Sequence, residues 1–112
     1  MKRLLVTVAT IALCVSLFGC SKDKPKVRVG NQRNDITDVQ LKRQSGNTYN
    51  INDVGRNSTT GYIEVDVSTY EVDAKPENVS GNATTFFTAE EDKLYTIVVL
   101  NTNPPTVRVD TP

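Results

Sequence analysis

The side chains of this sequence that could do chemistry are mainly carboxylates, because its 112 residues include no histidine. Histidine is the commonest general base and the commonest metal ligand in proteins. The two cysteines, Cys14 and Cys20, both lie within the first 20 residues. Serine and threonine are frequent, but no tuned base is available to activate one of them as a nucleophile. The sequence therefore predicts a protein that is not an enzyme and that needs no cofactor.

Two pairs of carboxylates could bind a cation. Glu64 and Asp66 are two residues apart, as are Glu71 and Asp73, and in a β-strand this spacing places both side chains on the same face. If the two segments pair as a hairpin, the four carboxylates form an acidic patch able to hold Ca²⁺, which prefers several oxygen ligands. The alternative is a solvated strand face, whose charges oppose aggregation. We predict no dedicated metal site.

Tyr62 is the aromatic residue to examine at the surface. In an alternating strand it lies opposite Ile63, on the same side as Glu64. An exposed tyrosine beside acidic groups suits contact with a sugar or a protein, whereas packing under a neighbouring loop is the structural alternative. Tyr62 and the four carboxylates together form the possible ligand-binding surface that the sequence predicts.

The first twenty residues predict a secretion signal that ends in a lipid anchor. Lys2 and Arg3 precede an apolar stretch, residues 4–18, that is shorter than the roughly 20 residues of a spanning helix and is typical of a secretory signal. The segment Leu17-Phe18-Gly19-Cys20 then resembles the bacterial lipobox. This resemblance implies cleavage before Cys20, acylation of Cys20 and anchoring in a lipid bilayer, because two or more acyl chains hold a protein stably on a membrane. The alternatives are a plain secretory signal with an incidental cysteine and an uncleaved anchor.

The resemblance to the lipobox also implies a location. Ser21, rather than aspartate, follows Cys20, which implies sorting to the outer membrane of a bacterium with two membranes. We therefore expect the bacterial cell envelope, with the protein on the periplasmic or the surface face. A nucleic-acid partner is not expected, because 13 basic residues balance 13 acidic ones and no global field attracts a polyanion.

The remainder of the chain shows the two-residue period of β-strands. Short runs of alternating apolar and polar residues are separated by turn residues, and no segment shows a helical stripe. Seven or eight such runs, at roughly ten-residue spacing, predict an all-β fold: a single antiparallel immunoglobulin-like β-sandwich, with a small barrel as the alternative. The most apolar run contains Tyr95, Ile97 and Val99. The predicted organisation is a signal peptide over 1–19, the acylated cysteine and a tether over 20–25, and the sandwich over 26–110.

A change in the alternation locates one bend. The apolar residues are odd-numbered at Ile63 and Val65 but even-numbered at Tyr70 and Val72. A slip of one residue turns every side chain of a strand to the other face. We therefore expect the chain to bend between Asp66 and Thr69, and the two strands on either side to form a hairpin.

Four segments of the predicted sandwich resemble a known family. In order they are Val27-Arg28-Val29-Gly30-Asn31, Gly61-Tyr62-Ile63-Glu64-Val65, Ser68-Thr69-Tyr70-Glu71-Val72 and Tyr95-Thr96-Ile97-Val98. They are similar to the V-R-V-x-N, G-Y-x-x-V, G-T-Y-x-V and Y-T-V-V motifs of a domain of unknown function found in bacterial secreted proteins and lipoproteins. Ser68 departs from the turn glycine of that pattern. The resemblance implies a fold for residues 26–110 and no particular function.

These observations predict a membrane-anchored envelope lipoprotein. Its domain is expected to act as a non-catalytic binding or structural accessory module, with an envelope protein as its partner. The alternative is a surface module that binds a glycan or calcium through Tyr62 and the carboxylates near it.

Overall fold

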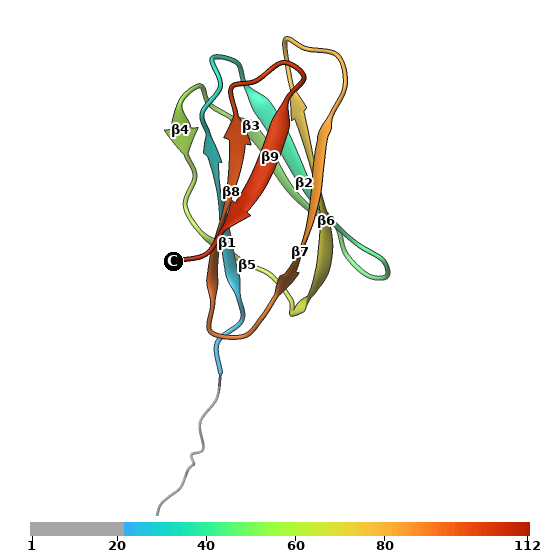
Figure 1. The fold of residues 1–112 in the computed structure, drawn as a ribbon. Coiled ribbons are helices and arrows are strands. Elements are labelled where there is room, and N and C mark those ends of the chain that lie inside the picture. Colours follow the sequence, from blue (N-terminus) through green and yellow to red (C-terminus); the bar gives the residue numbers. More distant parts are fainter. Residues whose placement is uncertain (1–21) are drawn as a thin grey trace, which may run out of the picture.

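The apolar residues that alternate along the sequence point into the space between two β-sheets, so the predicted immunoglobulin-like β-sandwich is confirmed. The structure is a computed structural model that describes residues 22–112, and its two sheets pack face to face (Figure 1). The predicted signal peptide, residues 1–19, and Cys20 lie outside the described residues. The strands are β1 (Lys26–Asn31), β2 (Thr37–Arg43), β3 (Tyr49–Val54), β4 (Ser58–Thr59), β5 (Ile63–Glu64), β6 (Ser68–Pro76), β7 (Ala83–Ala89), β8 (Leu94–Leu100) and β9 (Thr106–Asp110).

One sheet has five strands and the other has four. In the five-stranded sheet β4 and β5 both pair with β1, which pairs with β8, and β8 pairs with β9. The four-stranded sheet has the order β3-β2-β6-β7. All pairs are antiparallel except β1 and β8, which run parallel from Lys26 opposite Leu94 to Asn31 opposite Val99. The predicted sandwich therefore contains one parallel pair, and two strands of only two residues, β4 and β5, flank β1.

The core is formed by the inward-facing side chains of both sheets. The rings of Tyr70 and Phe87, from the four-stranded sheet, have centroids 5.7 Å apart. The ring of Phe87 lies 5.0 Å from that of Tyr95 in β8, so a row of aromatic contacts joins the two sheets. Burial raises the pKa of Tyr70 to about 12. Ile97, from the most apolar run of the sequence, is fully buried in this core.

The predicted bend after β5 is present, but the predicted hairpin is wrong. β5 pairs with β1 in the five-stranded sheet, whereas β6 pairs with β2 and β7 in the four-stranded sheet. Between them the chain crosses from one sheet to the other through Val65, which is buried, and Asp66. The hydroxyl of Tyr70 donates to the carbonyl of Asp66 at 2.6 Å and fixes this crossing. The inversion of alternation thus marks a change of sheet.

A buried polar network closes the end of the sandwich where β1 and β8 finish. Arg33 and Asp35, in the β1–β2 loop, form a two-pronged ion pair at 2.8 and 3.3 Å, and both residues are at most 5% exposed. The guanidinium of Arg33 also donates to the carbonyls of Leu100 and Thr102. The backbone N–H of Asn78 donates to the carboxylate of Asp35 at 3.2 Å. The ion pair therefore joins the β1–β2, β6–β7 and β8–β9 connections, which are far apart in the sequence.

At the other end, the last residues of the predicted tether are bound to the domain. Asp23 and Asp92 exchange two hydrogen bonds, at 2.8 and 2.9 Å, between the segment before β1 and the β7–β8 turn. Pro25 is buried, and its carbonyl accepts from the N–H of Val65 at 3.0 Å. The domain therefore includes residues 23–25, which we predicted as tether. Within residues 22–112 no helix is long and apolar enough to cross a membrane.

Candidate functional site

The structure separates the carboxylates of the predicted acidic patch. Glu64 lies in β5 of the five-stranded sheet, and Glu71 and Asp73 lie in β6 of the four-stranded sheet. Asp66 lies in the segment that crosses between the sheets. In the described part of the chain, no three histidine, cysteine, aspartate or glutamate side chains are grouped so that they could hold a metal ion. The four carboxylates thus do not form one surface.

Two of these carboxylates are paired with cations. The Asp66 carboxylate lies 3.2 Å from Nζ of Lys24 and 3.3 Å from Nη1 of Arg43. The hydrogen bond from Lys24, together with its charge, holds the pKa of Asp66 below its ordinary value. Asp73 is buried, and its Oδ2 lies 3.2 Å from Nζ of Lys42. Their charges are therefore offset within the domain.

Tyr62 is exposed, but the charged group over its ring is a cation. The residue is 39% exposed, and the guanidinium carbon of Arg28 lies 4.8 Å from the ring centroid. A guanidinium over an aromatic face is attracted by the negative face of the ring. The two side chains therefore hold each other in place on the outer face of the five-stranded sheet.

The register of the five-stranded sheet places Arg28 in the middle of a groove. Arg28 of β1 lies opposite Thr96 of β8, which lies opposite Asp110 of β9. Two hollows of about 400 and 230 Å³ adjoin along this row, and Arg28 and Thr96 line both of them. We call these two hollows together the outer groove; its lining includes Arg28, Thr59, Tyr62, Thr96, Asp110 and Thr111.

Arg28 differs from the other arginines of residues 22–112. Its Nε donates to Oγ1 of Thr96 at 3.0 Å, and neither a carboxylate nor a carbonyl of the described chain bonds its guanidinium. The other four arginines all have such a partner: Arg33 bonds Asp35, Arg43 bonds Asp66, Arg56 bonds the carbonyl of Asn34, and Arg108 bonds Asp110. Arg28 can therefore offer the N–H groups of its two terminal nitrogens to an anion, which is the geometry that binds carboxylates.

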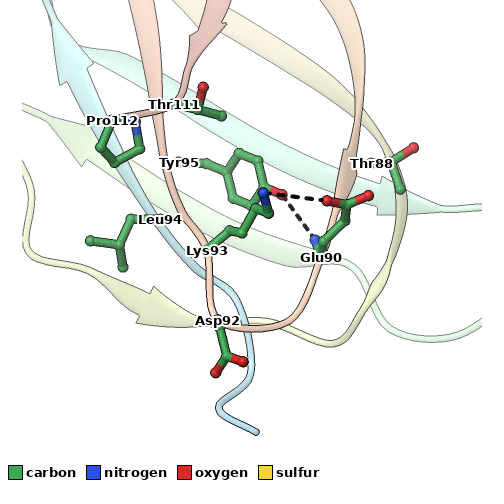
Figure 2. A pocket seen from close by; sticks show the side chains of 8 residues that line it. All are labelled: Thr88, Glu90, Asp92, Lys93, Leu94, Tyr95, Thr111 and Pro112. Atoms are coloured by element: carbon green, nitrogen blue, oxygen red, sulfur yellow. Dashed lines mark hydrogen bonds and ion pairs between the residues drawn. The ribbon is translucent and has the colours of Figure 1, made fainter.

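A third hollow, of about 540 Å³, adjoins the outer groove, and Leu94 lines both (Figure 2). Several of its polar groups are already paired with one another. Nζ of Lys93 lies 3.8 Å from Oε1 of Glu90, and the backbone N–H of Glu90 donates to the hydroxyl of Tyr95 at 2.9 Å. Figure 2 shows the Asp92 side chain pointing away from these groups. This hollow extends the concave surface, and its own charged groups offer less to a ligand than Arg28 does.

The sequence did not predict that Arg28 would line a groove. Arg28 is the polar member of the alternating run Val27-Arg28-Val29, as expected for the outer face of any strand. Its partner Thr96 is 68 residues away and belongs to the one parallel pair, which an antiparallel sandwich does not predict. The one local indication of a groove was Gly30, which lies two residues after Arg28 on the same face of the strand. Without a side chain, Gly30 leaves a depression in the surface next to Arg28.

Comparison with known proteins finds no family model and no curated protein that matches this chain. The resemblance to the secreted domain family and to the lipobox therefore stays a prediction. The geometry of residues 22–112, above all that of the outer groove, is the basis on which function can be argued.

Proposed function

We propose that this chain is a lipid-anchored protein of the bacterial cell envelope, and that its sandwich domain is a non-catalytic accessory module that binds an envelope component in the outer groove. The observation that supports binding is the pairing of Tyr62 with Arg28, a cation without an acidic partner among the described residues, in a concave surface. A concave site with a few placed polar groups is the usual form of a ligand-binding surface. The lipid anchor rests on residues 17–20.

The contacts of the segment before β1 limit how far the domain can lie from such an anchor. Asp23 is the first residue that the domain holds by hydrogen bonds. An extended chain covers at most about 3.6 Å per residue, so acylated Cys20 would keep Asp23 within roughly 11 Å of the anchor. The outer groove lies on the outer face of the five-stranded sheet and extends toward this same end, because Leu94, which lies opposite Lys26 at the start of β1, lines it. An anchored domain would therefore hold the outer groove close to the bilayer.

The anchor is tested by metabolic labelling of cells with an alkyne palmitate. We expect Cys20→Ser to abolish the label, because the lipobox assigns acylation to this thiol. The matched control is Cys14→Ser, which removes the other cysteine of the chain and should leave the label unchanged. Equal labelling of the Cys20→Ser variant and the wild type would contradict the anchor. Enrichment of the labelled protein with inner membrane would contradict the outer-membrane location.

The binding surface is tested by photo-crosslinking in intact cells. Replacing Tyr62 by p-benzoylphenylalanine places the reactive group beside the outer groove, and replacing Lys75, which is exposed on the four-stranded sheet, is the control. We expect a defined adduct from position 62 and none from position 75. Protease treatment then tells a protein partner from a glycan. Absence of adduct at position 62, or the same adduct from both positions, would show that the outer groove is not the binding surface.

Of the two alternatives, a glycan is favoured over calcium by one observation. The predicted calcium ligands are distributed over two sheets, and two of them are paired with lysine or arginine. By contrast, Tyr62 offers an exposed ring beside a hydrogen-bonding cation, the combination of flat apolar and polar contacts that a sugar needs. The second candidate function is therefore a glycan-binding module that uses the same groove.

A further inference from the structure

The outer groove has one strong binding point for an anion, the guanidinium of Arg28. Thr96 bonds its Nε and Tyr62 lies against it, so its orientation is fixed before a ligand arrives and little side-chain entropy is lost on binding. The acidic residue in the lining, Asp110, is bonded through both oxygens to Nε of Arg108, at 3.1 and 3.3 Å. The charge of Asp110 is thereby offset, and the terminal N–H groups of Arg28 remain available to an anion in the outer groove.

The remainder of the lining suits a sugar chain better than a peptide. Thr59, Thr96, Thr111 and Asn57 supply hydroxyl and amide groups around Arg28. An extended peptide typically binds by adding a strand to the edge of a sheet. The outer groove instead lies over β1 and β8, each of which already pairs with strands on both sides. The ligand must therefore bind through side chains, and these are rich in groups that match sugar hydroxyls.

We infer that the outer groove binds an acidic glycan, a sugar chain that bears carboxylates, with Arg28 bonding a carboxylate and Tyr62 contacting the sugar ring. This inference rests on the proposed function, because it names the ligand class of the same groove. Gly30 leaves room for that ligand beside Arg28. A Cβ at Gly30 would lie 3.6 Å from Oγ1 of Thr59 and 3.8 Å from a methyl carbon of Thr96, so a larger side chain would rise into the groove.

The test is calorimetric titration of the detergent-purified full chain with trigalacturonate, and with cellotriose as the neutral comparison. We expect trigalacturonate to bind and cellotriose to bind at least about tenfold more weakly, since hydrogen bonds to charged groups contribute enough for such a ratio. Arg28→Gln should weaken trigalacturonate binding by about tenfold or more. Lys75→Gln removes the same charge from the four-stranded sheet and should leave binding within about twofold, because distant exposed charges are screened.

Gly30→Val provides a second variant that alters no charge. Valine favours β-strands, and at this position its side chain would fill the floor of the groove, so we expect weaker binding with the melting temperature retained. Failure of trigalacturonate to bind, or binding that Arg28→Gln leaves unchanged, would overturn the inference. Equal binding of triglutamate with the same dependence on Arg28 would assign the groove to acidic peptides instead. Crosslinking from position 62 without trigalacturonate binding would overturn this inference alone, and loss of both would overturn the proposed function too.

Discussion

Replacing Asp35 by alanine is expected to lower the free energy of unfolding by about 3–5 kcal/mol. The substitution would leave Arg33, which is 5% exposed, as a buried cation without its carboxylate. It would also remove the acceptor for the backbone N–H of Asn78. Removing one partner of a buried ion pair costs more than the pair contributes, because the remaining charge is desolvated without compensation. Urea denaturation of the purified wild type and variant at neutral pH measures the difference.

The chain contains a matched control for this prediction. Arg108 and Asp110 have the same spacing as Arg33 and Asp35 and a similar distance, 3.1 Å, but their side chains are 52% and 46% exposed. Asp110→Ala should therefore cost less than about 1 kcal/mol, as is usual for solvent-exposed ion pairs. An equal loss of stability in the two variants would show that burial of the Arg33–Asp35 pair does not determine how much the loss of its carboxylate lowers the free energy of unfolding.

Acid should weaken the same interaction. The hydrogen bond from Arg33 holds the pKa of Asp35 below its ordinary value, despite the opposing effect of burial. The stabilisation is therefore complete above the unfolded pKa of about 4 and is lost as the pH falls from there through the folded pKa. We expect the stability difference between the wild type and Asp35→Asn to shrink below about pH 4. A difference that stays constant down to pH 2 would contradict this assignment.

Alternation in the sequence predicts which residues face the core, but it does not tell which sheet a strand joins. Val65, Tyr70 and Val72 are all buried, as their spacing indicates. The inversion of parity after Val65 also places the bend correctly. A hairpin and a crossing between sheets can both produce such an inversion, because each interrupts the strand. The hairpin prediction was wrong because the pairing of β5 with β1 depends on contacts distant in the sequence.

The same limit applies to the polar residues. Arg33 and Asp35 stand in a polar loop segment of the sequence, where charged residues are usually solvated. Their burial depends on the carbonyls of Leu100 and Thr102, which only the folded chain brings near. The same holds for Arg28. It differs from the other arginines of residues 22–112 because it has no acidic partner, and only the folded chain shows which side chains lie near it. For Tyr62, local sequence left open whether the ring is exposed or packs under a loop, and it placed acidic groups rather than Arg28 beside the ring.

Replacing Ile97 by alanine is the second substitution with a large expected effect, a loss of about 2–5 kcal/mol. Ile97 is fully buried in β8, which pairs with strands on both sides. It lies opposite Val29 in β1 and Val109 in β9. Truncation leaves a cavity that these paired strands cannot close, so the lost transfer free energy and the lost contacts add together.

Val67→Ala is the control for Ile97→Ala, because Val67 is an aliphatic residue that is 53% exposed. Its truncation should change the free energy of unfolding by no more than about 0.5 kcal/mol, as is usual for surface substitutions. Both variants are compared with the wild type by urea denaturation, where an unchanged slope shows that the same surface unfolds. A loss below about 1 kcal/mol for Ile97→Ala would be well short of the loss expected when a buried side chain leaves a cavity. Such a result would show that Ile97 and β8 do not lie at the centre of the core.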